Sequence, residues 1–158
     1  MTRLSTVSRV PCCHVPNIGF STRRAAGGVR TPDVIVVGAG PAGSTAARTL
    51  ALGGARVLIV DRATFPRYKP CGGGLTWRVL GRFPYLESVL PRIATHAVTR
   101  LHMEGPGGQA VTVDGGRPTV MMIRRIEFDH LLLQLAQEAG AELIEGAEIT
   151  RAEHRGQM

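Results

Sequence analysis

The pattern of apolar and polar positions between residues 33 and 61 predicts a strand, a turn, a helix and a second strand. Residues 34–37 are all β-branched, as expected for a parallel strand that is covered on both faces. Residues 42–52 are mostly small residues and helix formers, and residues 56–60 form a second apolar run. This order predicts a βαβ unit with a parallel sheet.

The stretch that follows predicts shorter elements. Residues 75–83 are typical of a short helix with one apolar face, and residues 84–96 fit either a loop or a short helix. Residues 97–103 alternate as a half-buried strand does, and a glycine-rich turn separates them from a partner strand at 110–113. We therefore expect an inserted β-hairpin here, and residues 119–123 predict one more strand.

The clearest helix after the first is expected at residues 125–139. Apolar side chains recur there at intervals of three and four residues, which places them on one helix face. Gly140 follows directly, in the position where a glycine commonly ends a helix. Residues 141–144 predict a strand, and residues 147–152 a further one.

The turn between the first strand and the first helix carries Gly38, Gly40 and Gly43 in G-x-G-x-x-G spacing. The first glycine allows a sharp turn, the second lets a pyrophosphate approach the backbone, and the third lets helix and strand pack closely. The phosphates would lie at the helix N-terminus, where free N–H groups and the helix dipole favour an anion. Asp61 ends the second strand, near the spacing of about 20 residues expected of the acid that binds the ribose hydroxyls. With Ala42 in the first helical turn, these residues predict a dinucleotide site.

The positive charge of this 158-residue chain is concentrated at its start. The net charge is +7, and residues 1–32 hold five arginines and no acid, which leaves 14 basic and 12 acidic residues for 33–158. Nucleic-acid binding is therefore not indicated, and aromatic residues are too few for a stacking platform. We interpret residues 1–32 as a basic, disordered arm. It is either an organelle transit peptide, because it is rich in Arg and Ser and free of acids, or an extension that begins at a start codon assigned too early.

The three cysteines, Cys12, Cys13 and Cys71, form no disulfide framework and no metal-binding pattern. Their odd number and the lack of C-x-x-C spacing indicate a reducing compartment, and hence a cytoplasmic protein unless the arm directs it to an organelle. No apolar run reaches the roughly 18 residues that a transmembrane helix needs. We expect no metal site.

Two further stretches carry a resemblance to a known family. The run FPRYKPCGGGL at residues 65–75 is the more specific, and the pattern R-x-x-F-D-x-x-L begins at Arg125. Together with residues 33–61, they resemble the geranylgeranyl reductase family of FAD-dependent enzymes, part of a wider group that includes the aromatic hydroxylases. The resemblance implies an α/β fold, namely a Rossmann-like βαβ FAD-binding domain with an inserted β-hairpin region, truncated. Residues 33–158 would be the N-terminal part of that domain.

The resemblance also implies which residues bind FAD. The pyrophosphate would lie over the glycines between Gly38 and Gly43, the adenosine ribose on Asp61, and Arg62 beside the adenosine. The acid at Asp61 argues against NADP in this site, because a 2′-phosphate would meet a negative charge.

At the flavin end, the resemblance implies a loop and an arginine. The loop with Cys71, Gly72 and Gly74 would run beside the ribityl chain and the isoalloxazine ring. Cys71 would face the cavity in which a substrate double bond is reduced, as the candidate catalytic residue. Arg125 would reach the flavin from the start of its helix. The alternatives are that Cys71 is a packed, inert side chain and that Arg125 is solvated.

In this family, reduced flavin passes hydride to an isoprenoid C=C bond. The resemblance implies FAD as the cofactor, NAD(P)H as a candidate electron donor and an isoprenoid or other lipophilic substrate, and it leaves peripheral membrane contact and the oligomeric state open. Two alternatives remain: a flavin monooxygenase or halogenase of the same fold, and a non-catalytic truncated fragment. The second arises because the family's later FAD motif is not found in these 158 residues.

Overall fold

The structure is a computed structural model that describes residues 31–152. Its central sheet is parallel and contains β1 (Val34–Val37), β2 (Val57–Asp61) and β8 (Glu142–Glu145), with β2 in the middle. The central strand β2 is almost wholly buried, which explains its continuous apolar run. The last strand of the described chain thus pairs with a strand from its beginning.

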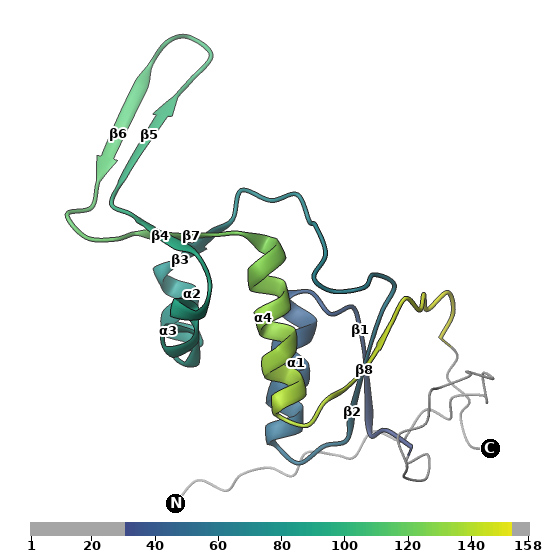
Figure 1. The fold of residues 1–158 in the computed structure, drawn as a ribbon. Helices are drawn as coiled ribbons and strands as arrows, with labels where there is room; N and C mark the ends of the chain where they lie inside the picture. Colours follow the sequence, from purple (N-terminus) through teal and green to yellow (C-terminus); the bar gives the residue numbers. More distant parts are fainter. Residues whose placement is uncertain (1–30, 153–158) are drawn as a thin grey trace, which may run out of the picture.

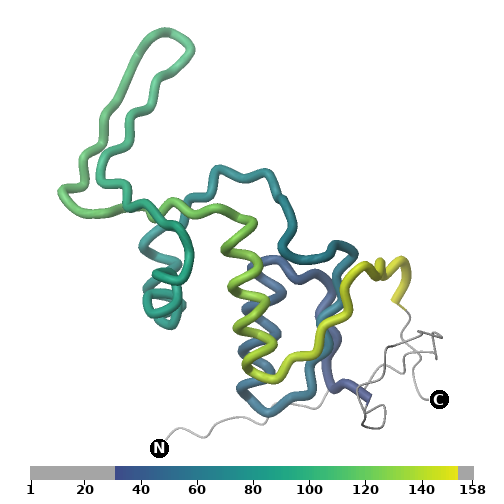
Figure 2. Tube along the Cα trace, viewed as in Figure 1, coloured from purple at the N-terminus to yellow at the C-terminus, as the bar shows by residue number. Residues whose placement is uncertain are grey.

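Helices α1 (Pro41–Leu52) and α4 (Arg125–Glu138) lie side by side next to this sheet (Figures 1 and 2). Helix α1 connects β1 to β2, and α4 leads into β8. The predicted βαβ unit and the predicted second long helix are therefore confirmed. Alanine and larger aliphatic side chains fill the core that the helices and the sheet share: Ala39, Ala47, Val57, Ile59, Leu133, Ala136 and Ala141.

A second, antiparallel sheet precedes α4. Its strands are β3 (Gly74–Thr76), β7 (Val120–Ile123) and β4 (Thr95–Val98), with β7 in the middle. Three short helical segments lie beside it: α2 (Trp77–Arg82), α3 (Tyr85–Val89) and η1 (Leu90–Arg92). Helix α4 contributes half of the buried residues of the core that these elements share, which comprises Leu80, Leu86, Leu90, Ile123, Phe128, Leu131, Leu132 and Leu135.

A hairpin of β5 (Arg100–Glu104) and β6 (Ala110–Asp114) projects from the body of the molecule (Figures 1 and 2). Every residue in both strands is exposed. Apolar side chains face each other across the two strands, Leu101 opposite Val113 and Met103 opposite Val111. The predicted inserted hairpin is confirmed, although its first strand begins at Arg100 rather than at residue 97.

Three expectations for single elements were wrong. Residues 75–83 do not form one helix, because Gly74–Thr76 pairs with β7 as a strand and the helix begins only at Trp77. Residues 97–103 are not one strand, because Val98 ends β4 and Arg100 begins β5 in a different sheet. Residues 147–152 form no strand. In the first two cases pairing partners distant in sequence override the local pattern.

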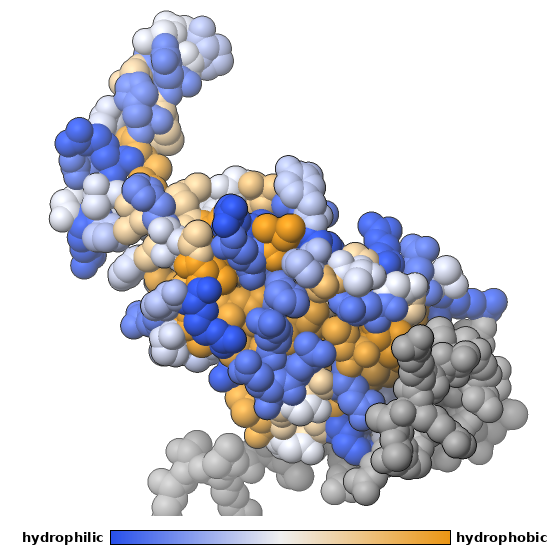
Figure 3. Space-filling model, viewed as in Figure 1, coloured by the Kyte–Doolittle hydropathy of each residue, from blue (hydrophilic) through white to orange (hydrophobic). Residues whose placement is uncertain are grey.

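The two cores leave an apolar groove of about 800 Å³ between α1, the α2–α3 segment and α4. Its walls include small side chains of α1, such as Ala42 and Ala46, and larger ones such as Phe83 and Phe128. Figure 3 shows apolar side chains gathered on the face where α4 and the α2–α3 pair lie. Among residues 31–152, no helix has both the length and the apolar character that crossing a membrane requires.

The glycine turn brings α1 unusually close to β1. A Cβ at Gly43 would lie 1.8 Å from the carbonyl oxygen of Gly38 and 3.2 Å from Cγ1 of Val36. Gly38 itself adopts a φ of +98°, which an L side chain rarely does. The turn therefore requires glycine at both positions, as the G-x-G-x-x-G spacing predicts.

Replacing Gly43 with alanine is expected to lower the free energy of unfolding by about 3 kcal/mol. The new methyl group meets backbone, which cannot move aside as a flexible side chain could. Urea unfolding followed by circular dichroism measures the change.

The matched control is Gly81→Ala in α2, because a Cβ there meets nothing within 4 Å. Helix propensity predicts that this variant is neutral or more stable by up to about 1 kcal/mol. Equal destabilisation of both variants would contradict the close approach of α1 to β1.

Candidate functional site

The N-terminus of α1 forms an open, electropositive cradle. Gly40 is the N-cap residue, no side chain caps the helix, and its first turn contains no acid. Gly40 has a φ of −73°, and a Cβ there would meet only Nη2 of Arg67, at 3.5 Å. The N–H groups at the start of α1 that have no helical partner, together with the helix dipole, thus favour an anion in this space. Gly38, Gly40, Ala42 and Gly43 lie together here, as predicted.

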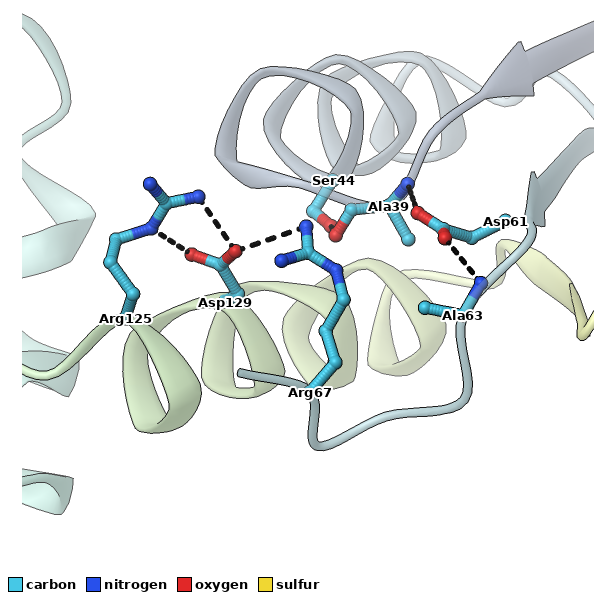
Figure 4. A network of polar contacts seen from close by, with 7 residues as sticks. All are labelled: Ala39, Ser44, Asp61, Ala63, Arg67, Arg125 and Asp129. Atoms are coloured by element: carbon cyan, nitrogen blue, oxygen red, sulfur yellow. Dashed lines mark hydrogen bonds and ion pairs between the residues drawn. The ribbon is translucent and has the colours of Figure 1, made fainter. Parts of the chain in front are cut away.

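Asp61 lies at the end of β2 beside this turn and has a structural role. Its Oδ2 accepts a hydrogen bond from the N–H of Ala39 at 2.6 Å, and its Oδ1 accepts one from the N–H of Ala63 at 2.8 Å (Figure 4). The carboxylate therefore ties the glycine turn to the strand that follows it. Contact with a ribose stays a prediction.

A hollow of about 230 Å³ opens beside Asp61. Gly38, Arg62 and Glu148 are among its lining residues, and Arg62 pairs with Glu148 through an exposed contact of 3.7 Å. Arg62 thus lies where the predicted adenosine end of the cradle would be. Exposed pairs of this kind contribute little to stability, so the Arg62 side chain is free to reorient.

The Cys71–Gly74 loop packs its backbone against the end of β7. A Cβ at Gly73 would lie 2.2 Å from the carbonyl oxygen of Ile123, and the Gly73 φ is +73°. The N–H of Gly73 donates to the Cys71 Sγ at 3.4 Å, and the thiol is exposed. Of the three consecutive glycines, Gly73 is the one at which a side chain is least tolerated. Only Gly72 and Gly74 were predicted from the sequence as site residues.

Arg125, at the start of α4, is held by a buried carboxylate. Asp129 is fully buried, and it accepts hydrogen bonds from Arg125 Nε at 2.6 Å and from Arg125 Nη2 at 2.8 Å. Arg67, from the loop after β2, places its Nη2 3.2 Å from the same carboxylate (Figure 4). The i, i+4 spacing of Arg125 and Asp129 was visible in the sequence, but the third partner was not.

The Cys71 thiol and the Arg125 guanidinium affect each other's pKa. The N–H of Gly73 and the Arg125 guanidinium lower the pKa of the Cys71 thiol, against smaller opposing effects of desolvation and of the Asp129 charge. Asp129 raises the pKa of Arg125 by hydrogen bonding to its charged form. Cys71 therefore carries more thiolate at neutral pH than an ordinary cysteine does.

The two groups of predicted site residues are joined through Arg67 and Asp129. The glycine cradle lies on one side, next to Arg67, and Cys71 lies on the other side, next to Arg125. Neither Arg67 nor Asp129 was among the site residues predicted from the sequence. Arg67 Nη1 is buried without a hydrogen-bond partner, and a buried donor of this kind fits an acceptor such as a phosphate oxygen.

A family model described as an FAD binding domain matches residues 31–158. The chain belongs to this FAD-binding domain family. The open backbone at Gly40 and the unpartnered Nη1 of Arg67 fit the pyrophosphate of FAD. No cluster of three or more potential metal ligands is present among residues 31–152.

Two curated relatives are similar to this FAD-binding domain. Menaquinone reductase from Mycobacterium tuberculosis is 42% identical over 127 residues, covering 77% of this chain and 31% of that protein. Geranylgeranyl diphosphate reductase from Rhodobacter capsulatus is 38% identical over 114 residues, covering 72% of this chain and 28% of that protein. The chain thus spans under a third of the length of these relatives.

Two solved structures share the fold of the FAD-binding domain. One is a geranylgeranyl bacteriochlorophyll reductase-like protein from Thermoplasma acidophilum, with a TM-score of 0.65 at 28% identity over 73% of this chain and 30% of that chain. The other is a myxobacterial chondrochloren halogenase, with a TM-score of 0.59 at 27% identity over 73% of this chain and 28% of that chain. The predicted fold class and the resemblance to geranylgeranyl reductases are confirmed.

Replacing Arg125 with methionine is expected to raise the pKa of the Cys71 thiol. A neighbouring cation stabilises the thiolate, so its loss shifts the pH profile of iodoacetamide alkylation to higher pH. Only part of the lowering is lost, because the hydrogen bond from the N–H of Gly73, its largest single cause, remains. The measurement uses a chain with Cys12→Ser and Cys13→Ser, in which Cys71 is the sole thiol.

Arg124→Met is the control for this measurement. It removes the same charge one residue away, from a side chain that pairs with Glu127. Identical alkylation profiles for the two variants would contradict the coupling of Arg125 to Cys71.

Proposed function

We propose that this chain is the FAD-binding part of an oxidoreductase that reduces C=C bonds of an isoprenoid or similar lipophilic substrate. The observation that carries the proposal is the junction at Asp129, which holds Arg67 against the glycine cradle and Arg125 beside Cys71. One cofactor lying across the cradle would therefore have its reactive end near Cys71. The curated names of the two relatives, one a geranylgeranyl diphosphate reductase and one a menaquinone reductase, support this substrate class.

When bound, FAD supplies hydride from its reduced ring. The residues of this chain bind and orient it. The α1 N-terminus at Gly40 and Gly43 would hold the pyrophosphate, and Asp61, at the end of β2, would bind the adenosine ribose. The bidentate pair with Asp129 gives Arg125 a single orientation beside the Cys71 loop.

Cys71 is proposed to face the substrate double bond. Its exposure and its lowered pKa give it a reactive, accessible thiolate next to the flavin position. NAD(P)H is the proposed electron donor. We further propose a cytoplasmic location, or an organelle if residues 1–32 act as a transit peptide, with peripheral contact to the membrane that holds the substrate.

The specific alternative is a halogenase or monooxygenase, which the likeness to the chondrochloren halogenase supports. The two reactions differ in their use of oxygen. A reductase saturates a prenyl chain anaerobically and adds 2 Da for each reduced double bond, whereas a halogenase or monooxygenase consumes oxygen when its flavin is reduced.

The test begins with FAD loading of the purified chain, followed by reduction with dithionite without oxygen. Geranylgeranyl diphosphate and menaquinone are then added separately, and products are analysed by mass spectrometry. A mass gain of 2 Da located in the prenyl chain supports the proposal, whereas the same gain in the quinone ring does not, because dithionite reduces quinones directly. In a parallel sample, air is admitted to the reduced protein and substrate after excess dithionite has been removed, and oxygen consumption with an unchanged prenyl chain favours the alternative. Failure to take up FAD indicates a non-catalytic fragment.

Gly40→Val is expected to weaken FAD binding by about 100-fold or more. The branched side chain fills the space through which the pyrophosphate approaches the backbone. Fluorescence quenching of FAD measures the affinity. Retention of full flavin occupancy would contradict this placement of the cofactor.

The fold itself is expected to tolerate this change. The φ of Gly40 suits any residue, and a Cβ meets only the far end of the Arg67 side chain. The free energy of unfolding without FAD should fall by no more than about 1 kcal/mol, the usual range for an N-cap change. A large loss of stability would indicate that the variant reports on folding rather than on the cofactor.

A further inference from the structure

Arg67 is more tightly held than a surface arginine. Only 19% of its side chain is exposed, although it comes from an extended loop. Its Nη2 lies 3.2 Å from Asp129, and its guanidinium carbon lies 4.9 Å from the centre of the Phe65 ring. Two contacts therefore fix the plane of the guanidinium.

The fixed guanidinium lies at the N-terminus of α1. Its Nη2 is 3.5 Å from the position that a Gly40 Cβ would occupy, so it lies beside the backbone at which the cradle opens. The first turn of α1 contains no acid that could neutralise it. Two electropositive groups, the helix end and Arg67, thus face the same space.

Neutralising Asp129 does not require Arg67. Arg125 already forms a bidentate pair with Asp129 at 2.6 and 2.8 Å, which is the strong geometry for a guanidinium and a carboxylate. With both arginines present, the group carries two positive charges and one negative charge. One positive charge is therefore in excess, and Nη1 of Arg67 is the buried donor without a partner.

We infer that Arg67 is a ligand of the FAD pyrophosphate and that Asp129 is the positioning residue that aims it. The inference rests on the proposed function, in which FAD occupies the cradle at α1. The Arg67 guanidinium donates to a pyrophosphate oxygen and adds its charge to that of the helix N-terminus. Asp129 touches no part of the cofactor and acts only by holding Arg67 and Arg125.

The test compares FAD affinities of the full chain and of its Arg67→Met variant by fluorescence quenching. Loss of a charge-assisted hydrogen bond is expected to raise the Kd about 10- to 100-fold. Arg67→Lys keeps the positive charge but lacks the planar guanidinium, so its Kd for FAD should lie between those of the unchanged chain and Arg67→Met. Arg100→Met is the matched control, because Arg100 forms a similar pair with Asp114 on the projecting hairpin, and it should leave the Kd unchanged.

A direct readout separates a ligand from a structural residue. The phosphorus-31 resonances of FAD at saturation should shift in Arg67→Met relative to the unchanged chain and to Arg100→Met. Asp129→Asn should move the same resonances in the same direction, because it releases Arg67. Circular dichroism at saturating FAD establishes that the variants are folded, and Arg67→Lys decides the matter if Arg67→Met does not fold.

The outcomes are distinguishable. An unchanged chain that does not bind FAD overturns the proposed function and this inference with it. An unchanged chain that binds FAD, while Arg67→Met binds equally well with identical phosphorus resonances, overturns the inference alone. A raised Kd with unshifted resonances also overturns it, because Arg67 would then act on the fold rather than on the phosphates.

Discussion

The charge of one buried carboxylate, that of Asp129, determines how the site is assembled. Removing a carboxylate from water costs several kcal/mol, and the cost is offset only when good partners are in place. Here the partners come from two separate segments, Arg125 one turn earlier in α4 and Arg67 in the loop after β2. The path of that loop is thereby fixed, since Arg67 has to reach the interior. Removing Arg125 would leave the buried carboxylate with only its single contact to Arg67, whereas removing Arg67 would leave the bidentate pair in place.

Next to this ion-paired group, the backbone of α1 lies very close to the end of β1. Gly43 and the small residues Ala39, Ala47 and Ala136 let α1 pack tightly within the core that it shares with the sheet and α4. Helix α4 has two apolar faces, one in each core, and so connects the parallel sheet to the antiparallel one. Its N-terminus lies at the boundary between them, which is why Arg125 can act on Cys71 while Asp129, one turn later, holds the Arg67 side chain that lies beside the cradle.

Much of the fold could be predicted, because local pattern and tertiary structure agree in the βαβ unit and in α4. The β-branched run at Val34–Val37 and the glycine spacing each have one structural interpretation. Gly74–Thr76 was mistaken for the start of a helix, since three residues are too few to show a strand period and only pairing with β7 determines the strand. The break between Val98 and Arg100 is likewise set by two different partner strands.

A candidate site residue could be recognised from the sequence where its own backbone conformation or a local motif requires it. Recognition was harder where the position of the residue depends on a partner that is distant in sequence. Gly38 and Gly43 are recognisable because their conformations demand glycine. Arg67 was not, because its sequence neighbours give no sign that Asp129 lies within 3.2 Å of it. Asp61 was identified as an important acid, but its bonds to the backbone of Ala39 and Ala63 are set by the geometry of the turn.

The pairing of β2 with β8 has a consequence for how the domain forms. Phe65, just after β2, donates to the Glu145 side chain 80 residues further along, so the central sheet joins the beginning and the end of the described chain. The entropy of closing such a long loop is lost before the pairing stabilises it, which makes folding slow compared with that of a helical bundle. During synthesis, β1, α1 and β2 emerge from the ribosome long before α4 and β8. The glycine turn and Arg67 are therefore synthesised well before Asp129, and Arg67 can take up its orientation only after α4 has been made.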